Sequence, residues 1–258
     1  MPNPPDPARV RVLADRAALG RTAAAVVAMA LRTRLAEKPR VRTVFAAAPS
    51  QLELLDALVR EPGIDWTRVD AFHMDEYLDL PPQAPQRFGN WLRAAFFDRV
   101  PLGSVHLIQP GADVLRTVDE YAGALAAAPI DLVCLGIGVN GHVAFNDPPV
   151  AELHDPADVK VVELDVVCRR QQVDDGCFDA LEQVPRRAIT LTVPRLLAAD
   201  ELFCVVPGSH KNRAVREALT GPLGMHCPAT ALRTHPNCTF FLDRESAAGL
   251  PPALLPVG

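Results

Sequence analysis

Three polar side chains able to hold or move protons follow one apolar segment in the middle of the chain. The segment 131–137 (DLVCLGI) is typical of a buried strand, and Asn140, His142 and Asp147 come shortly after it. His142 is the only one of the three whose unperturbed titration lies near neutrality. A nearby carboxylate could fix its tautomer and raise its basicity. A histidine simply hydrogen-bonded within a loop is the alternative, and the crowding of polar partners favours proton transfer.

A second candidate for proton chemistry is the acidic pair Asp75 and Glu76, which follows the apolar segment 70–74. In extended backbone, successive side chains point in opposite directions, so one carboxylate is expected to enter a cleft while the other faces water or a neighbouring helix. A partly desolvated carboxylate at a strand end suits proton abstraction next to a carbonyl. A solvated acidic loop is the alternative interpretation.

The elements that would position these residues alternate between strand-like and helical stretches. This pattern predicts an α/β fold, as a single three-layer α/β/α domain over residues 1–258 with a mainly parallel, Rossmann-like sheet. Predicted strands lie at 41–48, 68–74, 104–108, 131–137, 158–164, 188–193, 201–208 and 238–243, the last of which is expected to close the sheet. Predicted helices lie at 14–38, 50–60 with Ser50 as N-cap, 87–98, 118–128, 210–220 and 229–235.

Ligands of open parallel sheets sit beyond the carboxyl ends of the strands. Polar residues follow predicted strands in four places, at 46–51, 75–77, 138–147 and 208–211. These four segments are therefore expected to meet at one site.

Composition narrows the classes of partner. The net charge is −5, with no run of Lys or Arg, which argues against nucleic acid and against an anionic membrane surface. No apolar stretch reaches the roughly 18 residues of a membrane span. Six cysteines without a CxxC pair, and residues 1–10 without a signal-peptide layout, predict reduced thiols and a cytoplasmic location. The glycines at 136–141 do not form the dinucleotide fingerprint, so no nicotinamide cofactor is expected.

Several motifs together resemble one enzyme family. FHMDEYLDLP, FFDRV, LGIGVNGHVAFNDPP, QVPRRAITLTV, GSHKNRAV and LRTHP occur in the order and approximate spacing of the glucosamine-6-phosphate deaminase/isomerase family. The resemblance runs from about residue 41 to residue 242. The related 6-phosphogluconolactonases have Arg at the position of Tyr77 and lack the segment 144–146 (AFN), so these residues favour the deaminase branch.

The resemblance implies an aldose–ketose isomerisation with loss of ammonia, in which glucosamine 6-phosphate and water give fructose 6-phosphate and ammonium without metal or organic cofactor. It implies that His142 opens the sugar ring and that Asp75 moves a proton from C2 to C1. Asn140 and Asp147 would position His142, and Gly138 would line the sugar. At Asp147 the family usually has Glu, so the carboxylate stands on a shorter arm and its reach to His142 is open.

The region expected to bind phosphate departs from the family. Where the family has a Gly-(Gly/Ser)-Thr-Pro loop, this chain has APSQ at 48–51, and Pro49 offers no N–H. Ser50 keeps a hydroxyl at a predicted helix start, where anions are favoured. Ser50 and the neighbouring Gln51 are therefore candidate phosphate ligands.

The family's phosphate-binding Arg aligns with Gln172, and Arg169 or Arg170 could replace it if the register slips. Lys211 matches the family motif and would act as a point charge on the phosphate. The predicted partner is thus a small amino-sugar phosphate, with glucosamine 6-phosphate not necessarily the best substrate.

Two other functions are open. One is lactone hydrolysis on the same fold, with His142 activating water. The other is a non-catalytic sugar-phosphate sensor, which the altered phosphate loop would allow, although a pure binder would not need Asp75 together with His142. A homo-oligomer is also open, because both monomers and higher oligomers occur among similar proteins.

Overall fold

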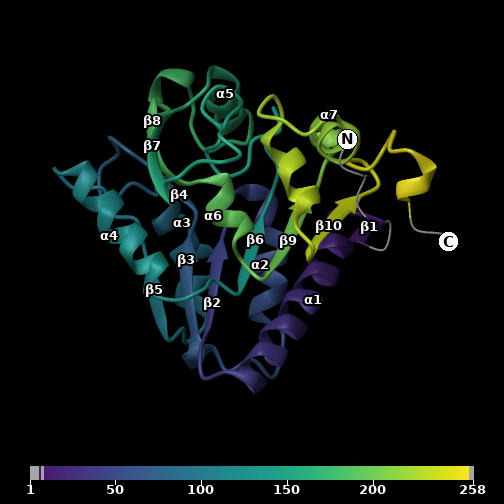
Figure 1. Ribbon diagram of the computed structural model, residues 1–258, viewed down its shortest axis with the longest axis horizontal. Helices are drawn as coiled ribbons and strands as arrows, with labels where there is room; N and C mark the ends of the chain where they lie inside the picture. Colours follow the sequence, from purple (N-terminus) through teal and green to yellow (C-terminus); the bar gives the residue numbers. More distant parts are fainter. Residues whose placement is uncertain (1–5, 7–8, 256–258) are drawn as a thin grey trace.

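A computed structural model describes residue 6 and residues 9–255. Seven parallel strands form the main sheet in the order β1-β10-β9-β6-β2-β3-β5 (Figure 1). Their bounds are β1 Val10–Leu13, β2 Val41–Phe45, β3 Val69–His73, β5 Ser104–His106, β6 Leu132–Leu135, β9 Glu201–Val206 and β10 Cys238–Asp243. The predicted mainly parallel α/β sheet is confirmed.

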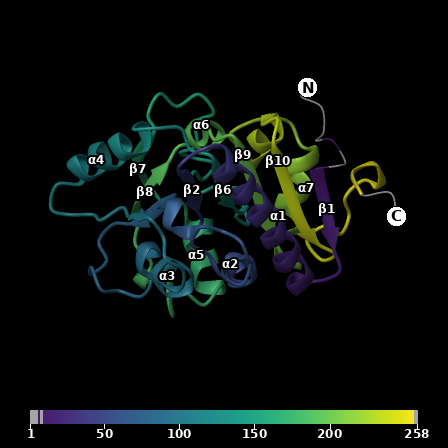
Figure 2. The ribbon, with the colours of Figure 1, turned by 90° about the horizontal axis from the view of Figure 1, so that it is seen from below.

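Helices cover both faces of this sheet, as the view from below shows (Figure 2). Alternate strand residues pack to opposite sides, so that Phe45 joins the apolar cluster of α1 to α3 and Val44 joins that of α4, α6 and α7. The helices are α1 Arg16–Glu37, α2 Leu52–Val59, α3 Phe88–Ala95, α4 Val114–Ala126, α5 Val166–Asp174, α6 Val193–Leu197 and α7 Asn212–Thr220. The three-layer architecture is therefore as predicted.

A smaller antiparallel sheet, in the order β4-β8-β7, lies beyond the carboxyl ends of the main strands (Figure 1). Its strands are β4 Asp75–Tyr77, β7 Val159–Glu163 and β8 Arg187–Leu191. Only Met74 separates β3 from β4, so the chain passes from the main sheet into the small one within two residues. The small sheet therefore holds Asp75 just beyond the carboxyl end of β3.

Several details of the sequence-based prediction are wrong. The strand at 238–243 does not close the sheet, because β1 pairs beyond it at the edge. Ser50 does not cap α2; it lies inside the 3₁₀ turn Pro49–Gln51, and Gln51 precedes the helix without a side-chain cap bond. Proline at the first position suits such a turn, because its missing N–H would have no partner there.

The cysteines are all free thiols, five of them buried and Cys177 half-buried, in line with their expected role as small apolar residues. No helix in the described part of the chain is long and apolar enough to cross a membrane. Most of residues 1–10, on which the expected lack of a signal peptide rests, lies outside the described residues, as do both ends of the predicted 1–258 domain.

Candidate active site

The four polar segments singled out in the sequence meet at one cavity beyond the carboxyl ends of the main strands. The segment after β2, the β3–β4 junction, the loop after β6 and the turn after β9 all contribute to its wall, together with α5. The predicted site residues on this wall are Ser50, Gln51, Asp75, Gly138, His142, Gln172 and Lys211. Asn140 and Asp147 do not line the cavity and lie behind His142 instead.

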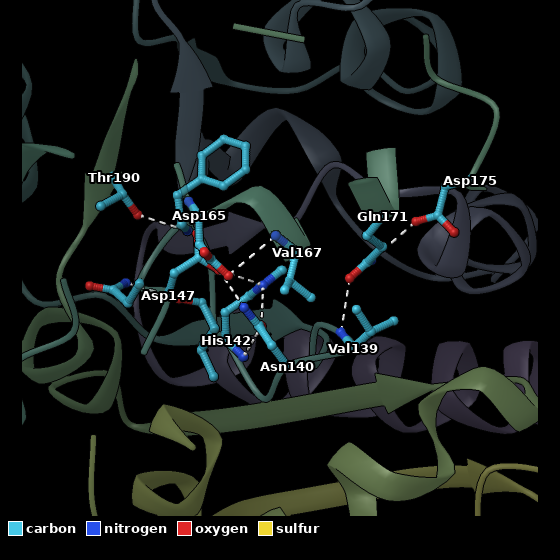
Figure 3. A network of polar contacts seen from close by, with 12 residues as sticks. Val139, Asn140, His142, Asp147, Asp165, Val167, Gln171, Asp175 and Thr190 are labelled. Atoms are coloured by element: carbon cyan, nitrogen blue, oxygen red, sulfur yellow. Dashed lines mark hydrogen bonds and ion pairs between the residues drawn. The ribbon is translucent and has the colours of Figure 1, made fainter. Parts of the chain in front are cut away.

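A hydrogen-bonded triad holds the imidazole of His142 (Figure 3). Nδ1 of His142 lies 2.8 Å from Oδ1 of Asn140 and 3.0 Å from Oδ1 of Asp147. The amide of Asn140 donates to the same carboxylate oxygen of Asp147 at 3.0 Å. Both groups facing Nδ1 are acceptors, which assigns a proton to Nδ1 and leaves Nε2 free toward the cavity. The shorter arm of Asp147 thus reaches His142.

The carboxylate of Asp147 is fully buried and stays ionised. Burial alone would raise the pKa of Asp147, but the hydrogen bond and charge of His142, the amide of Asn140 and the N–H of Asp165 outweigh it and hold the pKa below its usual value. A fixed negative charge therefore lies behind the imidazole of His142.

The loop that carries the triad is tightly turned and needs glycine at two positions. The N–H of Gly138 donates to the carbonyl of His142 at 2.9 Å, and a Cβ on Gly138 would lie 2.2 Å from the imidazole. Gly141 has φ 84°, a left-handed conformation that disfavours other residues, and a Cβ there would lie 2.4 Å from Sγ of Cys227. The glycines thus let the backbone close around His142.

The acidic pair divides as the alternation of β4 predicts, although both carboxylates are buried. Asp75 lines the cavity, and its side chain has no hydrogen-bond partner among the described residues. Burial, reinforced by the charge of Glu76, raises the pKa of the Asp75 carboxyl well above its usual range. An unpaired, buried carboxylate is a stronger base than a solvated one, because protonation removes a charge from a poorly hydrated position.

Glu76 points the other way and anchors helix α3. Its carboxylate accepts the backbone N–H groups of Tyr77 at 2.9 Å, Phe88 at 3.0 Å and Gly89 at 3.0 Å. Burial raises the pKa of Glu76 to about 7, against the lowering effect of these bonds. The interpretation of 75–76 as a solvated acidic loop is therefore wrong, and Glu76 has a structural position behind Asp75.

The opposite end of the cavity carries polar groups with few partners. Lys211 is 3% exposed, and no hydrogen bond or direct salt bridge reaches its ammonium from the described residues. Burial lowers the pKa of Lys211 to about 8. Gln51 donates to the carbonyl of Val205 at 3.1 Å while its own Oε1 is buried without a partner.

Neither arginine of α5 replaces the family's phosphate ligand. Arg169 donates instead to the carbonyls of Leu181 at 2.6 Å and Val184 at 2.8 Å, and Arg170 is exposed; neither lines the cavity. Gln172 does line it, as the alignment with the family's Arg predicts.

Two further cavity residues, Gln171 and Asp175, are missing from the sequence-based prediction. Oε1 of Gln171 accepts the N–H of Val139 at 2.8 Å, which fixes the amide so that Nε2 donates to Asp175 Oδ2 at 3.1 Å (Figure 3). Their spacing of i and i+4 would have been a signal only if α5 had been recognised as a helix.

Metal-ligating side chains gather at one place in the described part of the chain, where ligand atoms of His142, Asp147 and Cys168 lie within 4.8 Å of one another. The first two already bond to each other, and the thiol of Cys168 is hydrogen-bonded to Asp147. Hydrogen bonding accounts for this arrangement.

Comparison with known proteins identifies the family of this chain. The family model described as glucosamine-6-phosphate isomerases/6-phosphogluconolactonase matches residues 14–241. The chain belongs to this family. The glucosamine-6-phosphate deaminases of Bacillus thuringiensis (strain Al Hakam) and Bacillus cereus (strain AH820) are each 35% identical to it over 191 residues, covering 74% of this chain and 71% of theirs.

Solved structures of the family share the fold. A monomeric glucosamine-6-phosphate deaminase superposes with a TM-score of 0.84 at 24% identity, covering 93% of this chain and 99% of that one. The 6-phosphogluconolactonase of Thermotoga maritima gives a TM-score of 0.74 at 20% identity, covering 91% and 98%. The fold is thus common to both branches of the family, and the choice between them rests on the site.

Proposed function

We propose that this chain is an amino-sugar-phosphate deaminase/isomerase that converts glucosamine 6-phosphate and water to fructose 6-phosphate and ammonium. The observation that carries the proposal is that an unpaired buried carboxylate, Asp75, and the free nitrogen of an oriented imidazole, His142, line the same cavity. A base and a titratable acid on one substrate are what ring opening followed by isomerisation requires.

Ring opening is the task of His142. A proton must pass from the anomeric hydroxyl to the ring oxygen, and Nε2 is the nitrogen available for both transfers because Nδ1 is held by Asn140 and Asp147. Asp147 stabilises the imidazolium that forms while Nε2 carries the proton. A histidine that is simply hydrogen-bonded within a loop, the alternative interpretation of His142, would not need a buried carboxylate behind it.

Isomerisation is the task of Asp75. It removes the proton from C2 of the open chain and returns it to C1, while one proton passes from the nitrogen to O1, so that the C1 aldehyde becomes a hydroxymethyl group and the C2 amine becomes an imine. Water then adds to this imine and the nitrogen leaves as ammonium, which gives the ketose. Burial makes Asp75 a stronger base than a solvated carboxylate, and this favours abstraction of a weakly acidic C–H proton.

The phosphate would lie at the end of the cavity formed by Lys211, Ser50, Gln51 and Gln172. Lys211 is buried with no hydrogen bond or direct salt bridge from the described residues and with Asp175 as a more distant opposite charge, and an anionic ligand would pair with it directly. A cytoplasmic location and the state of oligomerisation stay predictions.

Ammonia release from glucosamine 6-phosphate, galactosamine 6-phosphate and glucosamine tests the proposal. We expect release that depends on Asp75, and no release from any of the three would refute the deaminase. Hydrolysis of 6-phosphogluconolactone in its place would favour the lactonase branch. Thermal stabilisation by these sugars without any product would favour a sensor.

A further inference from the structure

A second cavity adjoins the one just described. The two share part of their walls, namely Ala47, Ala48, Pro49, Phe88, Gln172 and Asp175. The second cavity, called the annexe below, is completed by Pro85, Gln86, Trp91, Gly176 and Cys177. The annexe therefore lies directly beside the main cavity, close enough for a group attached to a ligand there to reach it.

The apolar side of the annexe comes from the start of helix α3. Phe88 is held by ring contacts to Tyr77, with centroids 4.7 Å apart, and to Phe145, with centroids 5.3 Å apart. Trp91 lies one turn along the same helix and is half-buried, so part of its indole is accessible. Pro85 extends this surface in the loop before the helix.

The polar side of the annexe consists of planar groups with unused capacity. The side-chain amides of Gln86 and Gln172 have no hydrogen-bond partner among residues 9–255. Asp175 accepts from Gln171 through Oδ2, so Oδ1 is left for a donor from a ligand. Amide and carboxylate groups of this kind pair with the adjacent hydroxyls of a sugar.

The charge of the annexe argues against an anionic occupant. Asp175 is its one charged lining residue, and Lys211 belongs to the main cavity only. A second phosphate would meet a carboxylate and no cation. An uncharged ring that carries hydroxyls and one apolar face fits both the accessible indole and the planar polar groups.

The proposed reaction fixes which end of the amino sugar leads into the annexe. Asp75 and His142 must face C1 and C2, and neither residue lines the annexe. The anomeric centre must also be free for ring opening, which excludes a substituent on O1. A second group can therefore be attached only at the end of the amino sugar away from its reacting carbons.

We propose that the annexe is a subsite for a second, uncharged hexose linked to O4 of the amino sugar, whose O6 carries the phosphate, with Trp91 as stacking platform and Gln86, Gln172 and Asp175 as hydrogen-bonding groups. This inference rests on the proposed function for the orientation of the amino sugar.

The test measures binding apart from turnover. Calorimetry on the Asp75→Asn variant compares glucosamine with galactosyl-β-1,4-glucosamine and glucosyl-β-1,4-glucosamine. We expect one disaccharide to bind at least about tenfold more tightly than glucosamine, and Trp91→Ala in the same background to remove about tenfold of its affinity. Trp91→Phe, which keeps an aromatic face, is expected to retain most of it.

Controls separate the subsite from general damage. Leu115→Ala, on the exposed face of α4, is expected to change neither binding nor turnover. Gln86→Ala tests the annexe a second time on a loop outside the helix core, should Trp91→Ala fail to fold.

The outcomes also separate the two proposals. Disaccharides that bind no better than glucosamine, or variants that weaken all ligands equally, would overturn the subsite. Tight binding of a disaccharide that depends on Trp91, in a protein that releases ammonia from no sugar, would refute the deaminase and leave the subsite standing as a sugar-binding site.

Discussion

The two ends of the cavity are built in different ways. At the end formed by His142, the groups behind the cavity wall are paired, since Asn140 and Asp147 bond to each other and to the imidazole. At the other end, Lys211 is buried without a hydrogen bond or direct salt bridge from the described residues, and the Oε1 of Gln51 is unsatisfied. Unpaired buried polar groups cost free energy unless a ligand completes them. The groups around His142 are thus already oriented for proton transfer, whereas Lys211 and Gln51 lack a partner that a bound ligand would supply.

The largest effect on this contrast is expected when the base, Asp75, is neutralised. Asp75→Asn is expected to lower kcat by about 10³- to 10⁴-fold, because the amide cannot accept the C2 proton. Ligand affinity should change little, because the far end of the cavity is untouched. Steady-state kinetics and calorimetry on the same preparation check both parts, and near-normal turnover would exclude Asp75 as the base.

The next largest effect is expected at the carboxylate behind the imidazole. Asp147→Asn removes its charge while keeping its size, and should lower kcat by about 10- to 100-fold. Asp147→Glu keeps the charge and serves as the matched control. Equal kcat in both variants would mean that the charge of Asp147 does not act through His142.

At the far end we expect an effect on KM rather than on kcat. Lys211→Ala should raise KM for the sugar phosphate about tenfold, since one buried charge is lost. The pKa of about 8 has a consequence for the wild type as well. Lys211 is cationic below pH 8 and loses its charge above it, so KM should rise as pH increases beyond 8.

Lys211→Arg supplies the control for this pH effect. The guanidinium stays charged throughout the accessible range, so the rise of KM above pH 8 should be absent from this variant. If the rise persists, another group titrates there.

The last expected effect, at Glu76, is on stability and not on turnover or binding. Its pKa is raised from 4.5 to about 7 in the fold, so the folded state binds more protons than the unfolded state between these values, and stability falls as pH rises through this window. The full shift corresponds to roughly 3 kcal/mol. Glu76→Gln should flatten this part of the stability curve in urea unfolding at pH 4 to 8.

The absolute stability of Glu76→Gln is expected to be lower at every pH, because one amide N–H would face the N–H of Gly89 or Phe88. The slope with pH, not the level, is therefore the readout. An unchanged slope would show that Glu76 titrates normally.

The same contrast explains how far the sequence predicts the molecule. The triad is local, because Asn140, His142 and Asp147 lie in one loop whose glycines and polar residues mark it after a strand. The alternation at Asp75 and Glu76 is local as well, and it correctly predicts that the two carboxylates diverge. Local spacing is enough where the partners are neighbours in sequence.

The far end could not be predicted in this way, because its residues meet only through the fold. Gln171 accepts the N–H of Val139 across 32 residues of sequence, and nothing local marks that bond. The second sheet could not be predicted for a related reason. The strands β7 and β8 have ordinary strand patterns, which do not specify the sheet that they join. The edge strand β1 is short and was missed beside the long helix α1.

The central claim is that Asp75 removes the proton from C2 and that nitrogen then leaves the same carbon. Incubation of glucosamine 6-phosphate deuterated at C2, followed by NMR, tests it most directly. We predict fructose 6-phosphate and ammonium in equal amounts, with the deuterium at C1 or in the solvent, and both products formed at least about 10³-fold more slowly by Asp75→Asn. Unchanged substrate with the wild type, or products formed by Asp75→Asn at the wild-type rate, would contradict the account.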